Sequence, residues 1–166
     1  MGAYGLRSAE NLILPATTLG EGCYYAMFGG CTGLTTPPQL PAMTLTKSCY
    51  SAMFANCSSL TTAPALPATT LAERCYEDMF NGCTSLTTAP ELPAATLVNH
   101  CYLDMFCNCS NLSYIKCLAT NISAFSCTSY WVDGVSSTGT FVKASSMNSW
   151  STGISGIPTN WTVQNA

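Results

Sequence analysis

Residues 23–31 read CYYAMFGGC and place two cysteines eight residues apart around a Met-Phe pair, in a chain of 166 residues with 11 cysteines. Such a segment could serve as part of a disulfide framework, a metal site, a catalytic thiol or a packed core. The rest of the sequence helps to choose among these four roles, because the segment recurs along the chain.

The segment belongs to a repeat with a period of 26 residues. Four copies begin at Leu14, Leu40, Leu66 and Leu92, and a decayed fifth copy begins at Leu118. The predicted organisation is an N-terminal half-repeat or cap (1–13), four repeats (14–117), a degenerate fifth repeat (118–132) and a C-terminal cap (133–166).

Comparing the copies separates fixed positions from free ones, and fixed positions point to packing. Numbered in the first copy, the fixed positions are Leu14, Pro15, Ala16, Thr18, Leu19, Cys23, Tyr24, Met27, Phe28, Cys31 and Leu34. The three residues before the first cysteine differ from copy to copy and are mostly polar, so we expect them to be exposed.

Each copy combines a helix signal with a strand signal. In the third copy, the apolar residues Cys75, Met79, Phe80 and Cys83 fall at i, i+4, i+5 and i+8, which is the stripe of a short helix. Gly82 is typical of a helix stop. The stretch LTTAPELPA joins threonines to prolines, which predicts a strand of about three or four residues. The sequence therefore predicts an α/β repeat solenoid with short parallel strands, short helical turns and a β-rich C-terminal cap.

The motif MF-x-x-C-x-x-L occurs as MFGGCTGL, MFANCSSL, MFNGCTSL and MFCNCSNL. It resembles the BspA-type leucine-rich repeats of bacterial surface proteins, which are also found in phage-encoded proteins. The resemblance covers roughly residues 14–127 and implies a right-handed leucine-rich-repeat solenoid, an extracellular or cell-surface location, and a role in adhesion or host-surface binding. The family has no shared catalytic residue to carry over to this chain.

Most of the cysteines form two ladders with the period of the repeat. The ladders are Cys23, Cys49, Cys75, Cys101 and Cys127, and Cys31, Cys57, Cys83 and Cys109. Bridges between neighbouring rungs are conceivable, but an odd number of thiols cannot all pair. We favour free thiols that act as small buried hydrophobes in a narrow layer of the core.

Other chemistry finds little support in the sequence. The cysteine spacings lack the paired Cys-x-x-Cys knuckles of zinc sites. His100 adjoins Cys101, and neighbouring residues on a helix diverge too far to form an activated thiol pair. Glu77 and Asp78 are consecutive, whereas a glycosidase needs two carboxylates that face each other. We predict no catalytic residue, no metal and no cofactor, and we expect that the chain is not an enzyme.

Composition restricts the partners. Only 8% of the residues are charged, and the five Lys and Arg residues form no cluster, so nucleic acid and anionic lipid are not expected to bind. No apolar run is long enough to span a membrane, and no signal peptide is visible in this chain. We expect a monomer.

The tail after Cys127 is rich in Ser, Thr, Gly and Trp. Because the end of a repeat stack exposes apolar surface, we expect Trp131, Trp150 and Trp161 to cover that end, in preference to stacking on a sugar. The stretches GTFVK and NWTV read as short strands.

Two functions from different classes remain. The first is a non-catalytic binding module that presents its strand face to a host protein, a matrix component or a glycan. Its candidate contact residues are Thr36, Thr62, Thr88, Tyr114, Gln39 and Glu91. The second is a structural spacer or stalk of a larger surface protein or phage fibre, with binding located elsewhere.

Overall fold

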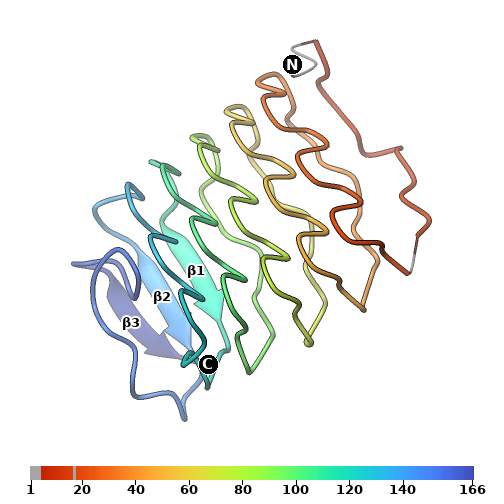
Figure 1. Cartoon of the computed structure of the whole chain (residues 1–166). Helices are drawn as coiled ribbons and strands as arrows, with labels where there is room; N and C mark the ends of the chain where they lie inside the picture. Colours follow the sequence, from red (N-terminus) through yellow and green to blue (C-terminus); the bar gives the residue numbers. More distant parts are fainter. Residues whose placement is uncertain (1–4, 17) are drawn as a thin grey trace.

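The computed structural model describes residues 5–16 and 18–166, so the first four residues of the predicted N-terminal cap lie outside the description. Successive repeats lie side by side along one axis, with the N-terminal residues and the three strands at opposite ends of the stack (Figure 1). We number the repeat units coil 1 (14–39), coil 2 (40–65), coil 3 (66–91), coil 4 (92–117) and coil 5 (118–132).

Each coil carries a turn segment, which is residues 22–31 in coil 1 and the equivalent residues in the other coils. Its N–H groups alternate between two directions. The N–H of Tyr50 donates to the carbonyl of Cys75 in the next coil at 3.1 Å, whereas the N–H of Cys49 donates to the carbonyl of Thr46 in its own coil at 3.2 Å. The alternation continues through the turn segments of coils 1–4, so every N–H group there is bonded.

A left-handed residue occurs at every fourth position of the turn segments. In coil 2 the φ angles of Ser48, Ala52 and Asn56 are 53°, 54° and 60°. A positive φ at the third residue of a turn is the geometry that type II turns require. Each segment is therefore a series of overlapping β-turns, in which turns with and without a left-handed residue alternate.

The predicted fold class, an α/β solenoid of the leucine-rich-repeat type with helical turns, is wrong. The described residues contain no helix, and their strands are three short parallel ones. The apolar spacing that suggested a helix arises instead from turns that repeat every four residues, with half of the N–H groups directed to a neighbouring coil. Nothing in the described residues marks a cell-surface location or adhesion.

The strands lie at the C-terminal end of the stack (Figure 1). They are β1 (Tyr114–Cys117), β2 (Thr140–Lys143) and β3 (Thr162–Asn165), and they form one parallel sheet in the order β1-β2-β3. Strands β2 and β3 overlap the stretches GTFVK and NWTV, so the prediction of two strands there is confirmed.

In coils 1–3 the strand side is reduced to single bridges. Thr44 bridges to Thr18 on one side and to Thr70 on the other, and Thr88 bridges to Tyr114. Proline explains the short pairing, because it has no N–H group to donate to a neighbouring strand. Prolines lie between the bridging threonines of each coil and the next in the sequence.

The core consists of side-chain columns that run along the stack. Phe54 stacks on Phe28 with a centroid distance of 5.5 Å and on Phe80 at 5.7 Å. A parallel column is formed by Tyr24, Tyr50, Tyr76 and Tyr102. In coils 2–4 the fixed cysteine, tyrosine, methionine, phenylalanine and leucine positions are buried, which confirms that these positions serve packing.

Trp131 ends both aromatic columns. Its indole stacks on Tyr102 at 6.1 Å and on Trp150 at 5.6 Å, and its Nε1 donates to the carbonyl of Gly156 at 2.8 Å. Trp161 is also buried and donates from Nε1 to the carbonyl of Ser136. The expectation that these rings cover the end of the core is confirmed for Trp131 and Trp161.

Candidate binding surfaces

The strand side contains two adjoining grooves between coils 2 and 3, and three of the six predicted contact residues line them. Thr62 and Thr88 both line a groove of about 300 Å³. Glu91 lines the neighbouring groove of about 430 Å³, together with Leu66 and several prolines. The two grooves share the residues Ala63 and Pro90.

The other three predicted residues lie apart from these grooves. Thr36 is half-buried and bridges to Ser8, whereas Gln39 is exposed on coil 1. Tyr114 is exposed at the start of β1. The structure therefore gathers Thr62, Thr88 and Glu91 and leaves the other candidates dispersed along the strand side.

The grooves lie where neighbouring backbones are not joined. No backbone hydrogen bond links residues 61–66 to residues 87–92, and both ranges lie within the described chain. Pairing resumes one coil later, where the N–H of Ala89 donates to the carbonyl of Tyr114 at 2.9 Å. The prolines of the stretch TTAPALP and of its copy in coil 3 explain the gap, because they have no N–H to donate.

The strand side carries little charge. The carboxylate of Glu91 is 3.0 Å from Nζ of Lys116, and both side chains are partly exposed to water. Such an exposed pair stabilises the fold by at most about 1 kcal/mol. The grooves thus offer threonine hydroxyls, proline rings and backbone groups, with one carboxylate that is already paired.

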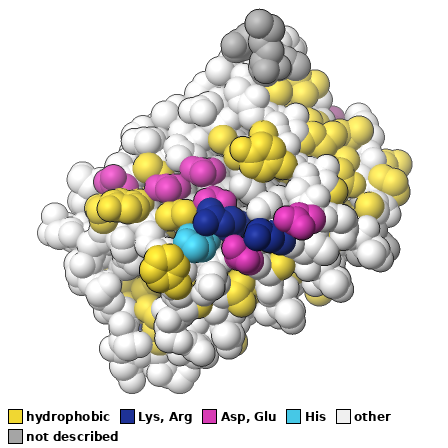
Figure 2. All heavy atoms as spheres, viewed as in Figure 1, with side chains coloured by type: hydrophobic (Ala, Val, Ile, Leu, Met, Phe, Trp, Pro, Cys, Tyr) yellow, Lys and Arg dark blue, Asp and Glu magenta, His cyan; other side chains and the backbone are white. Residues whose placement is uncertain are grey.

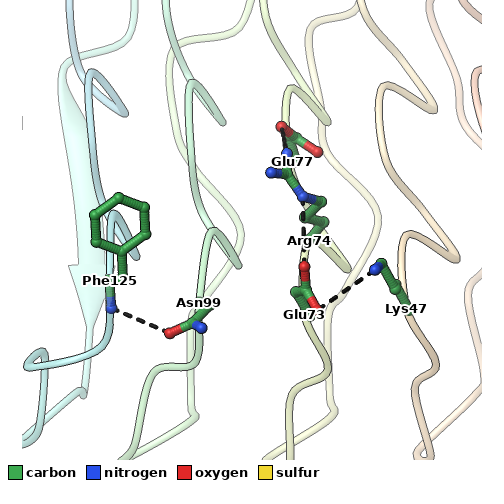
Figure 3. A network of polar contacts seen from close by, with 6 residues as sticks. All are labelled: Lys47, Glu73, Arg74, Glu77, Asn99 and Phe125. Atoms are coloured by element: carbon green, nitrogen blue, oxygen red, sulfur yellow. Dashed lines mark hydrogen bonds and ion pairs between the residues drawn. The ribbon is translucent and has the colours of Figure 1, made fainter.

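The opposite side, formed by the turn segments, carries a continuous ionic network that sequence reasoning did not identify. Figure 2 shows basic, acidic and hydrophobic side chains gathered on this face. Glu73 lies 3.5 Å from Lys47 of coil 2 and 3.6 Å from Arg74, which donates to Glu77 at 2.6 Å (Figure 3). Burial raises the pKa of Glu77, and the charge of Arg74 opposes that rise.

Three exposed aromatic rings share this turn side with the network. They are Tyr25, Phe125 and Tyr130, and all three are more than half exposed. This side could have been identified from the sequence variation at the free positions. Those positions lie on the surface, because the fixed positions face the core.

His100 was predicted to be exposed, and this prediction is wrong. It is half-buried, and its ring meets Phe125 edge-on at 5.2 Å. The backbone N–H of Phe125 donates to Oδ1 of Asn99 at 3.1 Å (Figure 3). This bond holds Phe125 beside His100. Because Cys101 is buried and points to the core, the two adjacent residues do not form a nucleophilic pair.

Three carboxylates and a thiol form an acidic cluster near this face. Burial raises the pKa of Asp104, and the neighbouring charges of Asp78 and Asp133 raise it further. Burial and the same carboxylates raise the pKa of Cys107. A raised pKa keeps the Cys107 thiol protonated at neutral pH, which opposes a nucleophilic role.

The ladder cysteines are buried in the core as predicted, except Cys23, which is exposed. The thiol of Cys57 donates to the carbonyl of Phe28 at 3.1 Å, and Cys83 donates to the carbonyl of Phe54 at 3.2 Å. Burial raises the pKa of Cys57 to about 12. Within the described part of the chain, all 11 thiols are free, and no three His, Cys, Asp or Glu side chains converge as metal ligands.

Comparisons with protein-family models, curated proteins and solved structures gave no match. Among residues 5–16 and 18–166 there is no helix of the length and apolarity needed to cross a membrane.

Proposed function

We propose that the protein is a non-catalytic binding module, and that its ligand is an extended, uncharged segment of a host or matrix polypeptide. The observation that carries this proposal is the pair of adjoining grooves lined by Thr62, Thr88 and Glu91. The resemblance of the MF-x-x-C-x-x-L motif to repeats of bacterial surface proteins, which are also found in phage-encoded proteins, would fit a ligand outside the cell.

The chemistry of the grooves supports a polypeptide ligand. The backbones of residues 61–66 and 87–92 form no hydrogen bonds to each other, and residues 61–66 bond to no other described backbone group, so the N–H and C=O groups of residues 61–66 are available to a main chain laid along them. The proline rings around Leu66 supply apolar contact, and the threonine hydroxyls donate and accept hydrogen bonds. The near-absence of free charge disfavours a strongly charged ligand.

The test is a screen of the purified protein on arrays of matrix proteins, host proteins and glycans, followed by affinity measurement for each hit. Thr62→Lys and Thr88→Lys place a long charged side chain in the groove, and we expect each to weaken binding at least tenfold. Thr44→Lys is the matched control, because Thr44 is exposed but lies outside both grooves. Binding that survives both groove substitutions would remove the strand side from the proposal, and a glycan hit would change the ligand class.

A structural spacer is the second candidate. The observation in its favour is the uniformity of the strand side, where Thr recurs in each of the first three coils at the positions of Thr36, Thr62 and Thr88. A spacer has no ligand of its own. It therefore predicts an empty array, together with unchanged properties in the Thr62→Lys and Thr88→Lys variants.

A further inference from the structure

The two grooves of the strand side join end to end into one trough between coils 2 and 3. The smaller groove is lined by residues 61–63 and 87–90, and the larger one by residues 63–67 together with Pro90, Glu91 and Pro93. The trough therefore follows the direction of the chain over residues 61–67. Seven residues span at most about 23 Å, so an extended ligand of about six residues fills the trough.

The two ends of the trough differ in chemistry. The smaller groove is lined by four exposed threonines, which are Thr61, Thr62, Thr87 and Thr88. Hydroxyl groups donate and accept hydrogen bonds, so this end suits a hydroxyl or amide side chain. The larger groove is lined mainly by four prolines, two alanines and Leu66, so that end suits an apolar side chain.

The trough matches an uncharged ligand. Among the described residues that line it, Glu91 alone is charged, and its carboxylate lies 3.0 Å from Nζ of Lys116. This pair leaves no net charge for a ligand to neutralise. A charged side chain placed in the trough would lose hydration without gaining an opposite charge.

One wall of the trough also offers main-chain groups. Residues 61–66 form no hydrogen bond to any described backbone group, whereas the N–H groups of Ala89 and Leu92 on the other wall donate to Tyr114 and Lys116 of coil 4. A ligand main chain is therefore expected to lie along residues 61–66. In an extended chain, side chains i and i+2 point to the same face and lie about 7 Å apart.

We propose that the trough selects an uncharged segment in which a hydroxyl or amide side chain and an apolar side chain are separated by one residue. The polar side chain lies at Thr62 and Thr88, and the apolar one lies at Ala65 and Pro93. The two grooves share Ala63 and Pro90, so their subsites adjoin and positions i and i+2 reach both of them. This inference rests on the proposed binding function and adds the sequence feature that the ligand must carry.

The test uses the full chain and an array of uncharged hexapeptides with capped ends. Each peptide carries one Thr or Gln and one Leu or Phe in a glycine background. The two side chains are either separated by one residue or adjacent, and both orders are included. We expect the best separated peptide to bind at least tenfold more tightly than the adjacent peptides of the same composition, because adjacent side chains of an extended chain point to opposite faces.

Three variants locate the two subsites. Thr62→Val combined with Thr88→Val removes two hydroxyls with little change in shape, and it should weaken binding of the best separated peptide at least fivefold. Ala65→Gln places an amide in the larger groove and should weaken binding of the same peptide to a similar extent. Thr44→Val is the matched control, because Thr44 is exposed and lines neither groove, and it should leave the affinity unchanged.

The outcomes distinguish the selection pattern from the binding function. Suppose that Thr62→Lys and Thr88→Lys abolish binding, but that both spacings bind equally or that the valine substitutions change nothing. The selection pattern would then be overturned, and the binding function would stand. Absence of binding on the hexapeptide, matrix-protein and host-protein arrays alike, or binding that ignores the lysine substitutions, would overturn both.

Discussion

Every fourth residue of a turn segment must adopt a left-handed backbone, and the last such position alternates between glycine and asparagine. Along the stack it is occupied by Gly30, Asn56, Gly82, Asn108 and Gly134, all with positive φ. The side chain of Asn56 lies over Gly82 in the next coil, and Asn108 lies over Gly134 in the same way. The small residue and the larger one therefore complement each other between neighbouring coils.

Gly82→Ala is expected to destabilise the protein for two reasons. A methyl group at a φ of +73° costs about 1–2 kcal/mol. That methyl group would also lie 2.6 Å from Oδ1 of Asn56, so the amide must move. We expect a larger loss of unfolding free energy than for Gly22→Ala, which has a φ of +61° but no atom within 4 Å of the new methyl group. Urea unfolding of both variants measures the difference.

The double variant Asn56→Gly with Gly82→Ala separates the two causes. Removing the amide relieves the clash and leaves only the backbone cost, so the double variant should lose less than the sum of its parts. Strict additivity of the two losses would show that Asn56 does not constrain Gly82.

At the level of the element, the turn segment explains why a helix was predicted. The apolar residues Met79, Phe80 and Cys83 follow Cys75 by four, five and eight residues. An α-helix with 3.6 residues per turn would place all four side chains on one face. A chain of turns that repeats every four residues places them on one face equally well. Periodicity alone does not distinguish the two, because it reports which residues are buried and not where their N–H groups point.

The repeat provides its own control for the energetics of the turn segment. Met79 is fully buried in coil 3, so Met79→Ala should lower the unfolding free energy by about 2–5 kcal/mol. Met27 holds the same position in coil 1 but is 45% exposed, so Met27→Ala should cost less than about 1 kcal/mol. Chemical denaturation of the two variants measures both losses, and equal losses would mean that the end of the stack is covered in solution.

For the whole molecule, the buried thiols make stability depend on pH. Burial raises the pKa of Cys57, Cys101, Cys109 and Cys117 to about 12, whereas an exposed thiol has a pKa near 9. The unfolded chain therefore releases protons at a lower pH than the folded chain. The stabilisation is fully present below about pH 9 and is lost as the pH rises toward 12.

We expect thermal unfolding under reducing conditions to occur at a constant temperature between pH 6 and 8 and at steadily lower temperatures above pH 9. Buried Tyr50 and Tyr76, whose pKa values are also raised by burial, act in the same direction. Circular dichroism at a series of pH values provides the measurement. A melting temperature unchanged up to pH 11 would contradict burial of these groups.

The sequence predicted some parts of the molecule well and others poorly. Fixed positions such as Leu60 and Phe54 are buried, and the strands near Phe141 and Val163 were predicted from the residue pattern of the stretches GTFVK and NWTV. The groove at Thr62 could be predicted only in part, because its shape depends on missing backbone pairing and not on residue type. The ionic network around Arg74 was missed, because its partners come from two coils and lie at free positions.

The direction of the hydrogen bonds has a mechanical consequence. The ladder between coils runs along the stack, and the N-terminal residues and β3 lie at opposite ends of it (Figure 1). A force that pulls these ends apart would act along the bonds of one interface at a time, so coils would peel away in sequence. Each coil of 26 residues would release about 90 Å of extended chain. The molecule would therefore lengthen in equal steps under tension.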